Sequence, residues 1–292
     1  MRDITVEDLF NTENPVIIDV RAPIEYKDGS IPGSINIPLF TDEERHIIGI
    51  IYKNEGQASA KWRAMELVSP KLPGLLKEIK ELSEGKIPVI HCWRGGMRSQ
   101  AVMTFLEFSG IRAKRLAGGY KAYRQYILQQ IPSMLPEKAV VIHGMTGVGK
   151  TEILKILNNQ GYPVLDLEGM AGHRGSIFGS IGIGEGNNQK TFDSLLFKRL
   201  QELQGSPYFI MEAESKRIGK ISQSDELMNK KVKGIHIYVT TSMQERINLI
   251  TEEYVNPYKG EKWFHEKIEE GMEKVFRRLK NEDLKIELME SL

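Results

Sequence analysis

The chain of 292 residues contains a single cysteine, Cys92. One thiol cannot form an internal disulfide, so the sequence excludes a disulfide-stapled fold and fits a reducing compartment. No apolar run approaches the roughly 20 residues that a membrane-spanning helix requires. The amino terminus carries an early acid, Asp3, and no apolar signal core. We therefore expect no secretion signal, no membrane partner and a cytoplasmic location.

The chain also has no large excess of charge of either sign. The 40 lysines and arginines nearly balance the 39 acids, and the formal net charge is +1. Such a chain is not a globally basic nucleic-acid binder, so a nucleic-acid site has to be a local patch on a solvated surface. The candidate patches are three groups of cations: Lys114, Arg115, Lys121 and Arg124; Arg174, Lys216 and Arg217; and Arg277, Arg278 and Lys280.

Apolar runs alternate with helical stretches in both halves of the chain. The runs that read as buried strands are 15–20, 33–38, 87–90, 113–116, 139–143, 163–166, 208–212 and 235–239. Strands that alternate with helices indicate parallel α/β sheets. The length predicts about two domains. The fold class is therefore α/β, with one parallel-sheet domain in each half.

The boundary between the halves contains Pro132 and Pro136 and has no periodicity. This pattern indicates a linker over 131–138, with domains over 1–130 and 139–292. The second domain is expected to end in a helical segment, because apolar positions from Phe264 to Leu279 fit one helix face. A glycine-rich stretch at 179–186 predicts a mobile loop.

Cys92 lies between the strand at 87–90 and a helical stretch at 100–108. A lone cysteine is more often a small core residue, but two glycines and two arginines follow this one. Backbone N–H groups at a helix start converge on an anion, and nearby arginines hold a thiol as thiolate. Cys92 is thus predicted to be a nucleophile or a sulfur or selenium carrier. The expected anion-binding loop consists of Trp93, Arg94, Gly95, Gly96, Met97, Arg98 and Ser99.

Cys92 and Arg98 also have the C-x-x-x-x-x-R spacing of cysteine phosphatases. A loop of that size accommodates a phosphate-like oxyanion, so spacing alone does not separate a carrier from a phosphatase. A phosphatase usually has a carboxylic acid that protonates the leaving group. No such acid is identifiable near Cys92 in the sequence.

A second anion loop follows the strand at 139–143. The stretch from Gly144 to Thr151 matches G-x-x-x-x-G-K-[ST] between a strand and a helix, which is the context that makes a P-loop credible. The motif does not identify the ligand: a nucleotide is the default, and another diphosphate fits the same cradle. Thr151 would ligate magnesium if a metal–phosphate complex binds. The predicted phosphate-binding residues are Gly144, Thr146, Gly147, Gly149, Lys150 and Thr151.

An acidic partner is expected near this P-loop. Glu212 ends an apolar strand and is the best candidate for a Walker B-like role, while Asp166 and Glu168 at another strand end compete with it. The structural alternative is that these carboxylates cap the next helix. Further candidates for contact with substrate phosphate are His173, Arg174 and Arg217, for which a solvated turn is the alternative.

The first half resembles a rhodanese domain, on Asp19-Val20-Arg21, the stretch 31–38 and the Cys92 loop, in that order. Most of the chain, from about Asp19 to Gly219, resembles the tRNA 2-selenouridine synthase family, in which a rhodanese domain is fused to a P-loop domain. The segments that carry this resemblance are 92–99, 118–124, the P-loop, 166–169, 173–176 and 214–219. The resemblance implies a rhodanese-like parallel-sheet domain followed by a P-loop NTPase-like α/β domain.

The resemblance also implies a transferase that replaces sulfur by selenium in wobble 2-thiouridine of tRNA, with selenophosphate as donor. It further implies S-geranylation of the same sulfur from geranyl diphosphate, which prepares a good leaving group for selenium. On this interpretation the P-loop grips the prenyl diphosphate, with magnesium on Thr151 if a metal binds, and the Cys92 loop handles selenophosphate. Expected partners are tRNA and the enzyme that produces selenophosphate. Trp93, Tyr120 and Tyr123 are candidates to stack a flipped anticodon base, and for each of them a place in the core is the alternative.

Three other functions remain open from the sequence. One is a P-loop kinase for a small molecule, fused to a rhodanese-like module. Another is a cysteine phosphatase of the C-x-x-x-x-x-R kind with a regulatory P-loop domain. The last is a non-catalytic switch in which the P-loop only senses a nucleotide. The ordered set of motifs, rather than either loop alone, favours the tRNA-modifying transferase.

Overall fold

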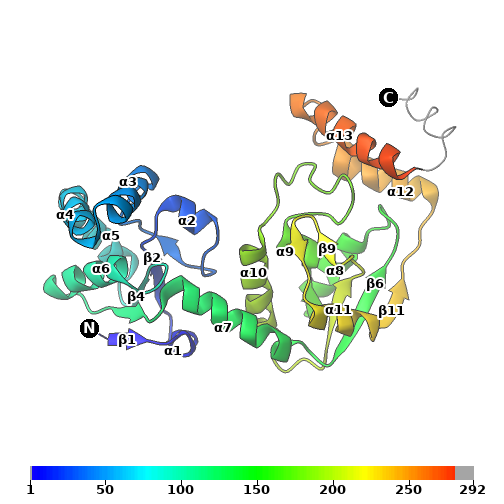
Figure 1. Ribbon diagram of the computed structural model, residues 1–292. Helices are drawn as coiled ribbons and strands as arrows, with labels where there is room; N and C mark the ends of the chain where they lie inside the picture. The colour runs from blue at the N-terminus through cyan, green and yellow to red at the C-terminus, as the bar shows by residue number, and fades with distance from the viewer. Residues whose placement is uncertain (1, 280–292) are drawn as a thin grey trace. The chain divides into compact units, whose positions relative to one another are not determined.

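The computed structural model describes residues 2–279 and divides them into two compact units (Figure 1). The first unit contains residues 1–131 together with 193–197, and the second contains the rest of the described chain. Both units are α/β, so the predicted fold class is confirmed. Within the described residues, no helix is both long enough and apolar enough to cross a membrane.

The first unit is built on a sheet of five parallel strands in the order β1-β5-β4-β2-β3. The strands are β1 (Arg2–Ile4), β2 (Val16–Asp19), β3 (Ile35–Asn36), β4 (Pro88–His91) and β5 (Lys114–Leu116). The helices are α1 (Val6–Phe10), α2 (Pro23–Lys27), α3 (Asp42–Asn54), α4 (Gln57–Val68), α5 (Leu72–Leu82), α6 (Met97–Phe108) and α7 (Gly119–Met134).

The core of this unit lies where the central strands meet the helices. Ile18 of β2 is paired in register with Ile90 of β4, and neither is exposed. Ile79 of α5 and Val102 of α6 join them in one buried cluster. Strands buried on both faces read as continuous β-branched runs, which is why the sequence located β2 and β4 well.

Helix α7 extends further than the sequence predicted. It continues through Pro132 to Met134, and strand β6 begins at Lys138. The first four residues of the segment assigned to a linker are therefore helical. Proline removes one helix hydrogen bond and its ring crowds the carbonyl four residues earlier. Only two residues of α7 follow Pro132, so the helix ends within a turn after this proline rather than before it.

The second unit has four parallel strands in the order β11-β6-β8-β7 and a small antiparallel pair of β9 and β10. The strands are β6 (Lys138–His143), β7 (Val164–Leu165), β8 (Tyr208–Glu212), β9 (Arg217–Ile218), β10 (Ile221–Ser222) and β11 (Ile235–Tyr238). The helices are α8 (Lys150–Asn159), α9 (Leu167–Ala171), α10 (Gln189–Glu202), α11 (Asp225–Val232), α12 (Met243–Ile250), the π-helix η1 (Thr251–Val255) and α13 (Lys262–Arg278).

The glycine-rich stretch at 179–186 is anchored rather than free. Ile181 within it is 1% exposed and joins Phe264 of α13 and Tyr254 of η1 in a separate apolar cluster, and Phe178 just before it packs against the same cluster. The expectation of a mobile loop considered only the glycines. The apolar residues between them have a partner surface on the carboxyl-terminal helices, which the local sequence does not reveal.

A buried ion pair lies at the carboxyl end of β2, in the middle of the first unit's sheet. Arg21 is 1% exposed, and its Nε donates to Asp19 Oδ2 at 2.9 Å. Its guanidinium also donates to the carbonyl of Gly29 at 2.7 Å and lies 4.2 Å from the ring centre of Tyr120. His91, at the end of β4, places Nε2 3.8 Å from the same Asp19 carboxylate. Burial, partly offset by Asp19, lowers the pKa of His91, so this ring is neutral at physiological pH.

We expect the substitution Asp19→Asn to destabilise the first unit by about 3 kcal/mol, because it leaves the Arg21 charge buried without its counter-ion. Hydrogen exchange of peptides from β2 and β4 as a function of urea would measure the loss. The control is Glu81→Gln, which removes an exposed partner of Lys77 and should change stability by less than about 0.5 kcal/mol. Equal exchange in the Asp19 variant and the wild type would contradict the prediction.

Candidate functional site

The thiol loop follows β4 and closes against the start of α7. The N–H of Tyr120 donates to the carbonyl of Cys92 at 2.9 Å, and the N–H of Lys121 donates to the carbonyl of Trp93 at 2.9 Å. Gly119 has φ +57°, and a Cβ there would overlap the Cys92 carbonyl oxygen. Gly119, the first residue of α7, therefore allows this helix to approach the loop.

Cys92 lies at the base of this loop and is only 3% exposed. Its Sγ is 3.3 Å from Ser99 Oγ, and that hydroxyl also donates to the carbonyl of Gly96 at 3.1 Å. Gly95 turns with φ +63°, and a Cβ there would lie 2.8 Å from the carbonyl oxygen of Leu116. The predicted loop residues thus form one turn of the backbone. Within it, Ser99 in the first turn of α6 faces the thiol.

Glu25 is a member of this site that the sequence did not reveal. Both terminal nitrogens of Arg98 donate to its carboxylate, one of them at 3.0 Å, and Arg45 Nε lies 3.7 Å away. Burial alone would raise the pKa of Glu25, but the hydrogen bond and charge of Arg98 lower it below the ordinary value. The only available signal was its position at the third residue of α2, where it accepts from the N–H of Ala22 at 3.1 Å.

The two arginines of the loop therefore differ in their surroundings. The Arg98 guanidinium is shared between Glu25 and the field of Cys92, and although burial opposes it, the Glu25 carboxylate raises the pKa of Arg98. Arg94 is exposed. Trp93 is half-buried, with its ring centre 5.7 Å from that of Tyr120. The predicted base-stacking residues Tyr120 and Tyr123 are 0% and 1% exposed, so their rings belong to the core.

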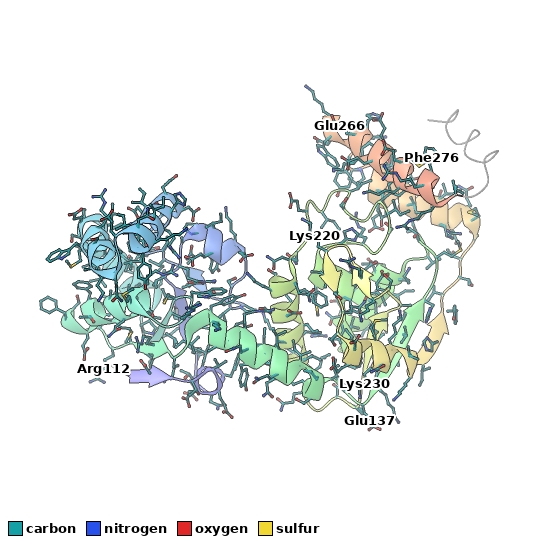
Figure 2. The ribbon with its side chains drawn as sticks, viewed as in Figure 1. Arg112, Glu137, Lys220, Lys230, Glu266 and Phe276 are labelled. Carbon is teal, nitrogen blue, oxygen red and sulfur yellow. The ribbon has the colours of Figure 1, made fainter. Side chains whose placement is uncertain are left out.

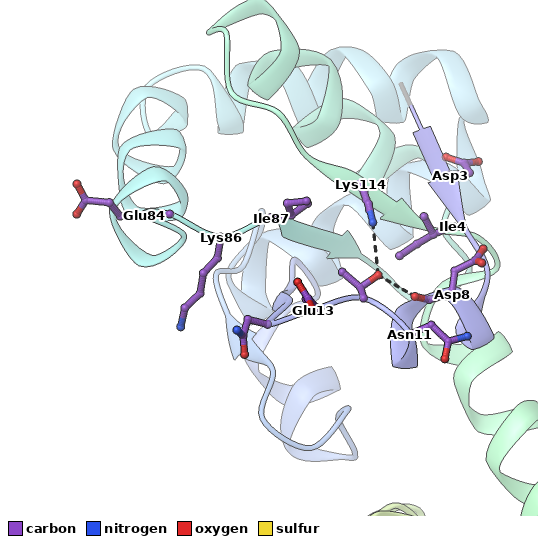
Figure 3. Close-up of a pocket in the computed structure, with 12 residues that line it drawn as sticks. Asp3, Ile4, Asp8, Asn11, Glu13, Glu84, Lys86, Ile87 and Lys114 are labelled. Carbon is purple, nitrogen blue, oxygen red and sulfur yellow. Dashed lines mark hydrogen bonds between the residues drawn. The ribbon is translucent and has the colours of Figure 1, made fainter.

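A cavity of about 740 Å³ lies at the opposite edge of the same sheet (Figure 3). It is next to the amino ends of β4 and β5, whereas the thiol loop follows the carboxyl end of β4. Asp3 on its wall is paired with Arg115, and Lys114 Nζ donates to Thr12 Oγ1 at 3.4 Å. None of the residues of the thiol loop lines this cavity, so its size does not mark it as the reaction site.

The P-loop connects β6 to α8 as the motif predicts. Gly147 and Gly149 have φ +81° and +82°, and Gly149 precedes the first residue of α8. Lys150 Nζ donates to the carbonyl of Gly144 at 2.8 Å. A Cβ at Gly147 would lie 2.7 Å from the carbonyl oxygen of Arg246 on α12. The loop is therefore held from outside by a helix nearly 100 residues later in the chain, as the bond from Arg246 Nε to the Thr146 carbonyl confirms at 3.1 Å.

Four carboxylates gather at the carboxyl ends of β7 and β8. Glu212 is fully buried and accepts from the N–H of Leu167 at 3.1 Å. Burial, followed by the charge of Asp166, raises its pKa well above the ordinary value, and its bond from Leu167 supports the start of α9. Asp166 caps α9, accepting from the N–H of Gly169 at 2.7 Å. The helix-cap alternative is therefore what the structure shows for Asp166.

Glu168 is the carboxyl group nearest the P-loop. Its Oε2 lies 3.5 Å from Thr151 Oγ1. Burial and the neighbouring Glu214 raise the pKa of Glu168 to about 7. The described residues contain no group of three or more histidine, cysteine or acidic side chains placed to hold a metal ion. The oxygen donors Thr151 and Glu168 fit instead a magnesium ion held mainly by substrate phosphates.

The remaining candidates divide between structural and exposed positions. Arg174 donates to the carbonyl of Ile181 at 2.8 Å, pairs with Glu253 at 2.8 Å and lies 4.7 Å from the ring centre of Tyr254. This arginine anchors the glycine-rich loop to η1. His173 is next to it, and burial lowers its pKa. Arg217 on β9 is exposed.

Comparison with known proteins follows the same division of the chain. A family model described as the tRNA 2-selenouridine synthase AAA domain matches residues 137–289, and a rhodanese-like domain model matches residues 5–126. A tRNA 2-selenouridine synthase of Sulfurovum sp. (strain NBC37-1) is 34% identical over 291 residues, which cover 94% of this chain and 78% of the relative. The chain belongs to the tRNA 2-selenouridine synthase family.

Further relatives in this family carry the same name. The one of Nitrosomonas europaea is 35% identical over 87% of this chain and 67% of its own length, and the one of Pseudomonas fluorescens is 33% identical over 94% and 78%. Among solved structures, the N-terminal domain of a Clostridium difficile 630 protein is 36% identical over 43% of this chain and 98% of that chain, with a TM-score of 0.42. The rhodanese-like domain and the P-loop-type domain predicted from the sequence are both confirmed.

The substitution Glu168→Gln should change how stability depends on pH. The folded pKa of Glu168 is about 7 against an ordinary 4.5, so the protonated form stabilises the fold below the ordinary value, and this contribution is lost as pH rises through 7. A glutamine keeps the uncharged form, so the melting temperature of the variant should fall less between pH 5 and 8. Thermal unfolding across this range measures the difference.

The matched control for this prediction is Glu152→Gln. Glu152 is an exposed residue of α8 that pairs with Lys155 three positions later. Its replacement should leave the pH profile of the melting temperature parallel to that of the wild type. Parallel profiles for the Glu168 variant as well would show that its carboxyl titrates normally.

Proposed function

We propose that this protein replaces sulfur by selenium in 2-thiouridine at the wobble position of tRNA, with selenophosphate as the selenium donor and S-geranylation as the preparatory step. The observation that carries the proposal is the presence of two built anion loops, one with a thiol and one with a lysine, in a chain that matches 2-selenouridine synthases over 94% of its length. The tRNA substrate is inferred from what those relatives are named for.

The P-loop supports the geranylation step. The backbone from Gly144 to Gly149 and the ammonium of Lys150 would hold the diphosphate, with Thr151 contributing an oxygen to magnesium. The thiouridine sulfur attacks the allylic carbon, a C–S bond forms, the C–O bond to diphosphate breaks, and the proton on N3 of the base is lost. Holding the departing diphosphate lowers the barrier, since that is where negative charge accumulates.

The thiol loop supports the selenation step. Its N–H groups and the exposed Arg94 would bind the phosphate-like head of selenophosphate, and the thiol of Cys92 at the base of the loop would position the donor for attack. The selenium attacks C2 of the base, a C–Se bond forms, and geranylthiolate leaves. Water then cleaves the Se–P bond and phosphate is released. The enzyme that produces selenophosphate is the partner that this step requires.

The phosphatase alternative lacks a proton donor at the thiol loop. The carboxyl group that the structure places there is Glu25, and Arg98 lowers its pKa. An ionised carboxylate in a bidentate pair is a poor general acid at neutral pH. Hydrolysis of an aryl phosphate that depended on Cys92 would nevertheless favour that alternative, and ATP turnover without RNA would favour a small-molecule kinase.

The substitution Cys92→Ser should abolish selenation and leave geranylation intact, because selenation uses the thiol loop and geranylation does not. Mass spectrometry of nucleosides from tRNA incubated with the variant, selenophosphate and geranyl diphosphate would show S-geranyl-2-thiouridine without 2-selenouridine. Equal loss of both products would refute this division of labour.

The substitution Lys150→Ala should slow geranylation by about 100-fold, because it removes the cation that stabilises the departing diphosphate. The rate of S-geranyl product formation, measured at saturating and at limiting geranyl diphosphate, checks this. The control is Lys155→Ala, which removes an exposed lysine of the same helix that pairs with Glu152. Unchanged geranylation in the Lys150 variant at both concentrations would assign the P-loop to another ligand.

A further inference from the structure

Three aromatic side chains form a column at the carboxyl ends of β6 and β11. His143 and Tyr238 are the last residues of these strands and lie opposite one another in register. Their rings are stacked with centres 4.6 Å apart at an interplanar angle of 21°. His236 lies two residues before Tyr238, on the same face of β11, and its Nδ1 is 2.6 Å from His143 Nε2. We call these three residues the ring column.

The ring column is open to solvent. Tyr238 is 73% exposed, and every residue of β11 is exposed. A cluster of rings that served only to pack the sheet would be covered, as Tyr120 and Tyr123 are in the first unit. The hydrogen bond between the two histidines fixes the ring of His143, which stacks on Tyr238. The column therefore presents a rigid aromatic face.

The column also adjoins the phosphate-binding loop. His143 directly precedes Gly144 of the P-loop, and the same loop leads into the cation Lys150, whose Nζ donates to the Gly144 carbonyl at 2.8 Å. Burial, followed by the charges of His236, Lys231 and Lys150, lowers the pKa of His143. Ligands of open parallel sheets bind at the carboxyl ends of the strands, which is the edge where the column lies. Figure 2 shows Lys230 and Glu137 together at the opposite edge, where Lys230 Nζ donates to the Glu137 carbonyl at 3.0 Å.

We propose that the ring column stacks an unpaired base of the tRNA anticodon loop next to the P-loop. This inference rests on the proposed function, because it takes tRNA as the substrate. Proteins recognise single-stranded RNA loops by stacking splayed bases on tyrosine and histidine rings, with cations nearby for the backbone. The structure favours this column over the tyrosines named from the sequence, because those are buried.

The test measures binding of an anticodon stem-loop RNA that contains 2-thiouridine, by fluorescence anisotropy at fixed salt. Tyr238→Ala should weaken binding by roughly 5- to 150-fold, the range for loss of one stacked base. Tyr238→Phe keeps the ring and should bind within about twofold of the wild type. The matched control Tyr162→Ala removes an exposed tyrosine that precedes β7 and should have no effect.

A second RNA identifies the stacked base. Stem-loops with one abasic site at each anticodon-loop position are measured against the wild type and Tyr238→Ala. At one position the two losses should not add, because a missing base and a missing ring remove the same contact. Additive losses at every position would overturn the inference. Displacement of the stem-loop from the ring column by ATP alone would overturn it as well.

The failure of this inference is distinguishable from the failure of the proposed function. Wild-type protein that binds the stem-loop tightly, with Tyr238→Ala equal to it, would overturn the ring column alone. Wild-type protein that binds no RNA would overturn the proposed function and this inference together. Binding of inorganic diphosphate, measured in parallel, should be unchanged in Tyr238→Ala, which verifies that the variant is folded around its P-loop.

Discussion

Both anion loops depend on one constraint, which is that each loop packs so closely against another segment of its unit that one glycine has no room for a side chain. At the thiol loop this glycine is Gly119, the first residue of α7, where a Cβ would overlap the Cys92 carbonyl. At the P-loop it is Gly147, which meets the Arg246 carbonyl of α12. In each case the loop is closed by an element from elsewhere in its unit, so the shape of the anion site is set by tertiary packing as well as by local sequence.

Much of the fold was accessible from the sequence because the decisive signals are local. Runs such as 87–90 and 139–143 combine burial with β-branched side chains, and both became central parallel strands. The two loops were located for the same reason, since each lies directly between a strand and a helix. The predicted end of α7 was wrong, because we treated the prolines at 132 and 136 as equivalent helix breakers. Only the second of them lies outside the helix.

The parts that were missed involve residues far apart in the chain. Glu25 meets Arg98 across 73 positions, and nothing in a 20-residue window connects them. The glycine-rich loop is anchored by Ile181 against η1 and α13, a contact with segments about 70 or more residues later that its own sequence does not indicate. Among the strand-end carboxylates the sequence favoured Glu212 but left Asp166 and Glu168 open. The structure shows Asp166 as a helix cap and Glu212 as a fully buried carboxyl group whose pKa is raised by burial.

The charge distribution of the thiol loop bears on how it would use its donor. A free arginine beside the thiol would bind a phosphate-like anion tightly and would also retain the phosphate product. Because Arg98 is already paired with Glu25, its charge is largely compensated, and an incoming anion depends mainly on backbone N–H groups and Arg94. Such a site would hold the proposed selenophosphate donor through geometry more than through net charge. That balance suits the proposed reaction, since phosphate has to leave before the next donor can enter.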